Sequence, residues 1–165
     1  MYEIIICPLK KLYQIVLDGD FSKSALIAVS SYEIRKDKLT PLNKALFMNF
    51  ADITNKTNPD AFSQATAERI AEYLKSIQND IDTLFICCDS GESRSTAMAA
   101  AIMRYNNTDE MQIWKNPEYH PNPLVYKLLC KALGIETTDE EIKSLTDINE
   151  TAFRDSISNN KRDVR

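Results

Sequence analysis

One short stretch of the sequence combines a candidate nucleophile with a candidate anion-binding residue. It runs from Cys88 to Ser95, reads Cys-Asp-Ser-Gly-Glu-Ser-Arg-Ser, and places Arg94 six positions after the cysteine. Intervening residues in a tight loop can turn their backbone N–H groups toward one point, and a following helix adds unpaired amides and the positive end of its dipole. The spacing therefore suits a thiolate nucleophile beside a bound phosphate.

The side chains of this stretch have complementary roles in such chemistry. A helix N-terminus and a nearby guanidinium favour the thiolate form of a cysteine, which is the form that attacks phosphorus. We expect Arg94 to bind two phosphate oxygens through its planar fork, and Ser95 to donate its hydroxyl to the thiolate. The loop residues expected to surround the phosphate are Asp89, Ser90, Gly91, Glu92 and Ser93. The predicted reaction forms a phosphocysteine, from which water removes the phosphate.

A phosphate ester also needs an acid that protonates its leaving group, which accelerates departure by typically about 10² to 10⁴. Asp52 directly follows a predicted strand over residues 45–50 and is the candidate acid. Asp60 and Asp82 are weaker rivals. An aspartate in this position is also common as a turn former or helix cap, so this alternative stays open for Asp52.

The elements that must position these residues follow from the hydrophobic pattern. Short apolar runs predict four strands, over residues 2–7, 24–30, 45–50 and 83–88. Helical periodicity predicts five helices, which begin near Pro8, Asn58, Ser93, Leu124 and Thr138. This alternation predicts an α/β domain with a mainly parallel sheet of about four to five strands, which binds ligands at the carboxyl ends of its strands. Cys88 stands at such an end.

The composition is that of a single soluble domain. The 165 residues suffice for one core, predicted over residues 1–155, with a flexible polar tail over residues 156–165. A net charge of -4 argues against nucleic-acid binding, and no apolar segment approaches the length of a membrane span. Four cysteines without CxxC spacing and a single histidine predict free thiols, no metal or other cofactor, and a cytoplasmic location.

The stretch from Cys88 to Ser95 resembles the C-x5-R-S signature of the cysteine-dependent protein tyrosine and dual-specificity phosphatases. The chain resembles in particular small bacterial and phage members in which an F-x-D-I segment and a helix precede the signature loop, as Phe50-Ala51-Asp52-Ile53 does here. Pro121-Asn122-Pro123-Leu124 is similar to a turn of the same relatives. The resemblance implies a phosphatase fold, Asp52 as general acid, and a phosphorylated protein or small phosphoester as substrate.

Three residues in and beside the loop depart from the family pattern. Cys87 stands where relatives carry a histidine that organises the loop, and it is either a core residue of the strand or a redox partner of Cys88. Asp89 and Glu92 bring negative charge where many relatives are neutral or basic. If these carboxylates face the site, they disfavour multiply phosphorylated inositol headgroups; if they face outward, they only raise solubility.

Two alternative functions belong to other classes. The first is a pseudophosphatase that binds phosphate without turnover, suggested by Cys87 and by the open role of Asp52. The second is sulfur or arsenate chemistry on a similar cysteine loop, which fits Arg94, Ser95 and Asp52 less well. The leading hypothesis is a phosphomonoester hydrolase that acts on phosphotyrosine or on related phosphoesters.

Overall fold

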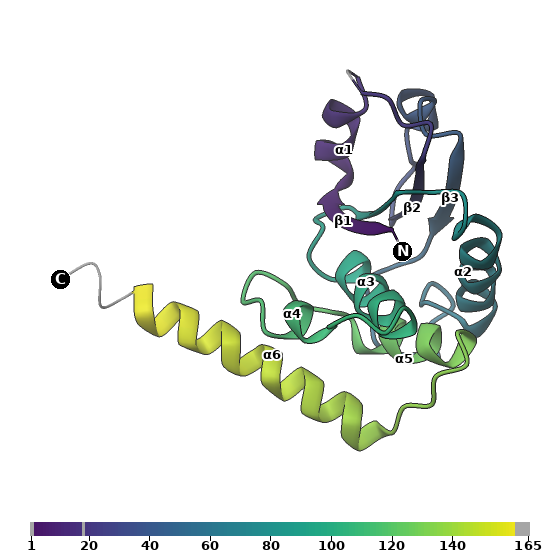
Figure 1. Ribbon diagram of the computed structural model, residues 1–165. Coiled ribbons are helices and arrows are strands. Elements are labelled where there is room, and N and C mark those ends of the chain that lie inside the picture. Colours follow the sequence, from purple (N-terminus) through teal and green to yellow (C-terminus); the bar gives the residue numbers. More distant parts are fainter. Residues whose placement is uncertain (1, 18, 161–165) are drawn as a thin grey trace.

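The structure, a computed structural model, describes residues 2–17 and 19–160 (Figure 1). Within them, four strands form one sheet: β1 (Glu3–Pro8), β2 (Ser24–Ser30), β3 (Lys44–Asn49) and β4 (Thr83–Cys88). Their order across the sheet is β1-β4-β2-β3, and every neighbouring pair is parallel. This confirms the predicted α/β class and the parallel sheet.

The two central strands, β2 and β4, carry the most continuous apolar sequence. All seven residues of β2 and the last five of β4 are buried, because helices cover both faces of a parallel sheet. Successive side chains of a strand point to opposite faces. Cys88 therefore belongs to the core cluster on one face of the sheet, and Cys87 to the cluster on the other face.

Helices connect and cover the strands. They are α1 (Leu9–Ile15), α2 (Gln64–Ile77), α3 (Arg94–Tyr105), α4 (Met111–Trp114), α5 (Pro123–Ala132) and α6 (Asp139–Asn160), with a short 3-10 turn η1 over Lys36–Leu39. The first helix, α1, packs on one face of the sheet, while α2, α3 and α5 pack on the other (Figure 1). No helix in the described ranges has the length and apolar character that a membrane span needs.

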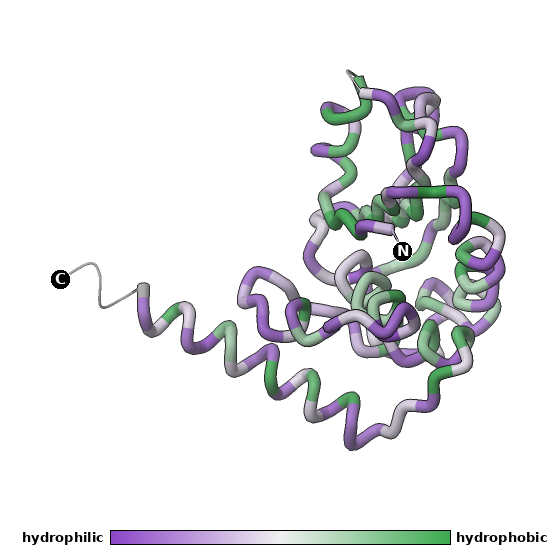
Figure 2. The backbone as a smooth tube through the Cα atoms, viewed as in Figure 1, coloured by the Kyte–Doolittle hydropathy of each residue, from purple (hydrophilic) through white to green (hydrophobic). Residues whose placement is uncertain are grey.

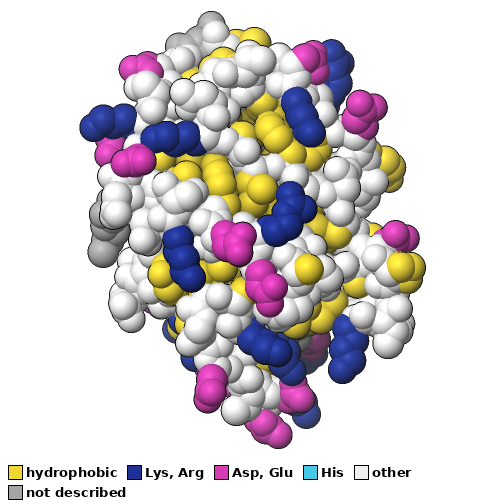
Figure 3. All heavy atoms as spheres, turned by 90° about the vertical axis from the view of Figure 1, so that its right-hand side faces the viewer, with side chains coloured by type: hydrophobic (Ala, Val, Ile, Leu, Met, Phe, Trp, Pro, Cys, Tyr) yellow, Lys and Arg dark blue, Asp and Glu magenta, His cyan; other side chains and the backbone are white. Residues whose placement is uncertain are grey.

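The surface has no large region of a single charge on the face drawn in Figure 3. Lys and Arg side chains are interspersed there with Asp and Glu side chains, and hydrophobic atoms are visible between them. Figure 2 shows α6 leaving the body of the molecule as a helix of mixed hydrophilic and hydrophobic residues.

The helix predicted to begin at Asn58 begins instead at Gln64. Its N-cap is Ser63, whose hydroxyl accepts a 3.2 Å hydrogen bond from the backbone N–H of Thr66. The residues before the cap form a turn, in which the carbonyl of Asp60 accepts a 2.7 Å hydrogen bond from the N–H of Ala51. This segment thus holds the backbone beside Asp52 rather than extending the helix.

The C-terminal region also differs from the prediction. Thr138 caps α6 as expected, because its hydroxyl accepts a 3.1 Å hydrogen bond from the N–H of Glu141. The helix then continues to Asn160, so residues 156–160 of the predicted tail are helical, while the flexibility of the tail stays a prediction. Apolar side chains recur at helical spacing as far as Phe153 and Ile157, so the helical pattern extends into the predicted tail. Residues 161–165 of the predicted tail lie outside the described residues.

Candidate active site

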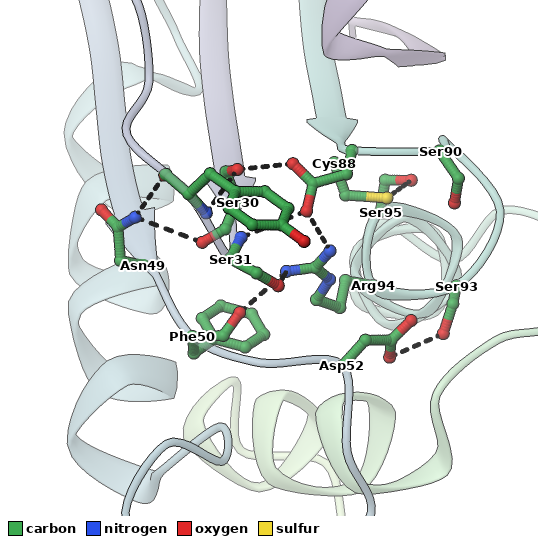
Figure 4. Close-up of polar contacts among 12 residues, drawn as sticks. Ser30, Ser31, Asn49, Phe50, Asp52, Cys88, Ser90, Ser93, Arg94 and Ser95 are labelled. Carbon is green, nitrogen blue, oxygen red and sulfur yellow. Dashed lines mark hydrogen bonds and ion pairs between the residues drawn. The ribbon is translucent and has the colours of Figure 1, made fainter.

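The loop between β4 and α3 lies at the carboxyl edge of the sheet. The strand ends at Cys88 and the helix begins at Arg94, as the sequence predicts. The sulfur of Cys88 lies 3.2 Å from the backbone nitrogen of Gly91 and 3.1 Å from the hydroxyl oxygen of Ser95, the latter contact drawn in Figure 4. An amide and a hydroxyl are thus both placed to donate hydrogen bonds to this sulfur.

Gly91 gives the loop a shape that no other residue type can adopt without strain. Its φ of +77° lies in the left-handed region. A Cβ at this position would lie 2.7 Å from the nitrogen of Pro8 and 2.9 Å from the carbonyl carbon of Cys7, at the end of β1. The tight turn that aims the Gly91 amide at Cys88 therefore depends on the missing side chain.

We expect Gly91→Ala to lower the free energy of unfolding by about 3 kcal/mol, since it combines a positive φ with a backbone clash. Gly134→Ala is the matched control, because Gly134 has a φ of +79° but a Cβ added there would have nothing within 4 Å. It should lose only about 1 kcal/mol. Denaturant unfolding of both variants measures the difference, and equal losses would contradict the close approach of Gly91 to β1.

Arg94 is almost fully buried and holds its guanidinium with three contacts. Its Nη1 donates to the hydroxyl of Ser31 at 3.0 Å and to the carbonyl of Phe50 at 2.8 Å, and its Nη2 donates to Asp89 Oδ2 at 2.7 Å (Figure 4). The buried Nε has no acceptor among the described residues. A guanidinium has five N–H donors, so these contacts leave the Nε–H and one Nη2–H. Two such neighbouring donors can bind two oxygens of one phosphate.

Asp52 lies against the same loop. Its Oδ1 accepts a 2.9 Å hydrogen bond from the hydroxyl of Ser93 (Figure 4). The same oxygen accepts a 2.8 Å hydrogen bond from Nδ2 of Asn122. Asn122 is itself fixed, because its Oδ1 caps α5 by accepting from the N–H groups of Leu124 and Val125. The structure therefore brings the predicted acid next to the signature loop and anchors it to two elements.

The rival aspartates are placed differently. Asp82 precedes the amino end of β4, where it pairs with Lys23 at 3.5 Å, so it lies at the opposite end of the strand from Cys88. The backbone carbonyl of Asp60 accepts a hydrogen bond from Ala51, next to Asp52, but no described hydrogen bond joins the Asp60 side chain to the loop, and both Asp52 and Asp60 are exposed. Of the three aspartates, Asp52 alone has a side chain hydrogen-bonded to a residue of the loop among the described contacts.

Asp89 and Glu92, the two acidic loop residues, have different surroundings. Asp89 accepts hydrogen bonds from the hydroxyl of Ser30 at 2.5 Å and the N–H of Ser31 at 3.1 Å, in addition to the ion pair with Arg94. Burial raises the pKa of Asp89, but these hydrogen bonds and the nearby guanidinium outweigh burial and lower the pKa overall. Asp89 thus contacts Arg94 on the side of the candidate site, whereas Glu92 is exposed; the effect of these charges on substrate choice stays a prediction.

Cys87 is directed away from the loop. Its sulfur lies 3.2 Å from that of Cys7 on the opposite face of the sheet, and all four cysteines of the chain are free. The contact with Cys7, together with burial, raises the pKa of Cys87, so it stays a neutral thiol. This geometry favours a core residue over a redox partner of Cys88.

Sequence reasoning missed Ser30, the last residue of β2, and Ser31, which follows it. Ser30 and Ser31 contact the Asp89–Arg94 pair, although they lie about sixty positions earlier in the chain. The available signal was their place at the end of a predicted parallel strand, since the carboxyl ends of such strands meet at one edge of the sheet.

Comparisons with known proteins add information on the fold. No family model and no curated protein matches the sequence. The solved PTP-2 phosphatase of Cydia pomonella is similar with a TM-score of 0.55 and 19% identity, over 78% of this chain and 84% of that one. PTPMT1 in complex with PI(5)P has a TM-score of 0.48 and 14% identity, over 93% and 94% of the two chains. Tk-PTP in its active form has a TM-score of 0.44 and 17% identity, over 89% of this chain and 90% of that one.

Proposed function

We propose that this chain, which has the fold of the protein tyrosine phosphatases, is a cysteine-dependent phosphomonoesterase that acts on phosphotyrosine or a related phosphoester. One observation carries the proposal: a cysteine sulfur, a carboxyl group and a buried guanidinium, two of whose donors have no acceptor among the described residues, lie together at one loop. They belong to Cys88, Asp52 and Arg94. Cleavage of a phosphate ester through a covalent intermediate requires a nucleophile, a group that binds the phosphate oxygens, and an acid.

In the first step, the thiolate of Cys88 attacks phosphorus in line with the leaving oxygen. The loop amides and the Nε edge of Arg94, which consists of its Nε–H and the second Nη2–H, hold the other phosphate oxygens while charge redistributes among them. The bond between phosphorus and the leaving oxygen breaks, and that oxygen takes a proton from Asp52. Because both contacts of Asp52 are made by Oδ1, we assign the proton to Oδ2. The products are a free alcohol or phenol and phosphocysteine.

In the second step, water attacks the phosphocysteine. Asp52, now a carboxylate, accepts a proton from this water, and the S–P bond breaks to release inorganic phosphate. The hydroxyl of Ser95, 3.1 Å from the sulfur, donates to the departing thiolate. A free thiolate of this kind needs a reducing compartment, which agrees with the cytoplasmic location expected from the sequence.

A second candidate function is favoured by one contact. The ion pair between Arg94 and Asp89 places a carboxylate on the guanidinium that would bind phosphate. Because this pair bears on the group that would bind phosphate and not on bond cleavage, it also agrees with a protein that binds phosphate without turnover. The two functions differ in whether a bound aryl phosphate is cleaved.

The test is hydrolysis of a simple aryl phosphate by the full chain, followed by phosphotyrosine and phosphoserine peptides of one sequence. Turnover that inorganic phosphate inhibits competitively supports the proposal. Phosphate binding without turnover would support the second candidate. Thiosulfate turnover without ester hydrolysis would instead indicate sulfur chemistry on the same loop.

A further inference from the structure

Asp89 connects the signature loop to the end of β2. One carboxyl oxygen accepts from the hydroxyl of Ser30, and the other accepts from both the N–H of Ser31 and Nη2 of Arg94. The Arg94 side chain is 5% exposed and that of Asp89 32%. A carboxylate that contacts the anion-binding arginine of a site either competes with the anion or holds the arginine in position for it.

The distribution of donors on Arg94 separates these two roles. Asp89 takes a single Nη2–H, while Ser31 and Phe50 occupy Nη1. The Nε, which an oxyanion needs for a side-by-side contact, is buried and without an acceptor among the described residues. The carboxylate thus takes one hydrogen of Nη2, and the Nε–H and the second Nη2–H stay without an acceptor among the described contacts.

The surroundings of Asp89 indicate a fixed support rather than a movable occupant. Two donors hold its carboxylate independently of Arg94: the hydroxyl of Ser30, the last residue of β2, and the N–H of Ser31, which follows the strand. Both carboxyl oxygens therefore have a donor without the arginine. The backbone carrying these donors is fixed as well: Nδ2 of Asn49 donates to the carbonyls of Ser30 and Tyr32, at 3.3 Å and 2.7 Å. The hydroxyl of Ser30 also accepts from the N–H of Tyr32 at 3.0 Å.

We propose that Asp89 is a positioning residue, which together with Ser30 and Ser31 of the β2 end holds Arg94 with its Nε edge toward the phosphate. This inference rests on the proposed function of the loop and adds a residue that acts through Arg94. An arginine side chain has many rotamers, so fixing one before the ligand arrives lowers the entropic cost of binding. The negative charge of Asp89 is then a requirement of the site, although it repels phosphate at longer range.

The test uses two variants that remove one negative charge each. Asp89→Asn deletes the charge that contacts Arg94, and Asp60→Asn deletes an exposed charge outside the loop, at the residue whose backbone carbonyl bonds to Ala51. Simple electrostatics predicts equal or tighter phosphate binding in both. The positioning role predicts different results: the dissociation constant of inorganic phosphate should rise by roughly tenfold in Asp89→Asn, and stay equal or fall in Asp60→Asn. Both constants are measured by calorimetry, with unfolding curves to confirm that each variant is folded.

Ser30→Ala provides a second test that changes no charge. It removes the hydrogen bond that holds Asp89 and leaves the ion pair in place. Phosphate affinity should fall in the same direction as in Asp89→Asn, by a smaller factor. Where the variants turn over substrate, KM for aryl phosphate should rise more than kcat falls.

The outcomes separate this inference from the function on which it rests. Tighter phosphate binding in Asp89→Asn would show a competing carboxylate and overturn the positioning role, even if the wild type is an active phosphatase. Weaker binding in Asp89→Asn, in a wild type that binds phosphate but never cleaves esters, would support the positioning role and reject the phosphatase. A wild type that binds no phosphate would overturn both.

Discussion

Cys88→Ser is expected to lower the turnover of an aryl phosphate by roughly 10⁵-fold. Losses of this scale are typical when the nucleophile is removed from a set of catalytic residues that act together. The hydroxyl of serine is far less acidic than a thiol, so the attacking anion is essentially absent near neutral pH. The binding of inorganic phosphate should stay within a few-fold of the wild type, because Arg94 and the loop amides are untouched. Steady-state kinetics and calorimetry measure the two effects separately.

Cys87→Ser is the matched control, since it changes the neighbouring residue of the same strand in the same way. Cys87 lies on the opposite face of the sheet beside Cys7, and we assign it no part in the reaction. Its turnover should remain within about tenfold of wild type in the folded fraction, although a buried hydroxyl will lower stability. If Cys88→Ser keeps wild-type turnover, or if Cys87→Ser loses it while folded, the nucleophile is assigned wrongly.

Asp52→Asn is expected to lower kcat for a poorly activated ester such as phenyl phosphate by roughly 10² to 10⁴-fold. The amide keeps an oxygen that can accept from Ser93 and Asn122, but it has no proton to give to the leaving oxygen. Steady-state kinetics of the wild type and the variant with the same ester at one pH measure this loss.

Two controls separate acid catalysis from a structural effect. An ester with a far more acidic leaving group, such as p-nitrophenyl phosphate, needs less help from an acid and should show a smaller loss in Asp52→Asn. Asp60→Asn changes the rival aspartate, whose exposed side chain has no described contact with the loop, and should keep kcat within about threefold. An equal loss with both esters, or a larger loss in Asp60→Asn, would contradict the role of Asp52.

The sequence by itself determined those features that depend on neighbours along the chain. The bounds of β2 and β4, the start of α3 and the cap at Thr138 all follow from the spacing of apolar residues and from local capping chemistry. The same is true of the loop from Cys88 to Arg94, since its shape is set by a strand end, a helix start and one glycine. The start of α2 was predicted wrongly because two cap-like residues, Asn58 and Ser63, precede it, and only the latter caps the helix.

Only the tertiary structure decided what surrounds the loop. The order β1-β4-β2-β3 places β2 beside β4, which brings Ser30 and Ser31 to Asp89 across about sixty residues of chain. No local pattern encodes that adjacency, because strand order is set by packing of the whole sheet between its helices. From the sequence alone, Asp89 is therefore expected to repel a phosphate bound at the loop. In the folded chain it is the partner of Arg94.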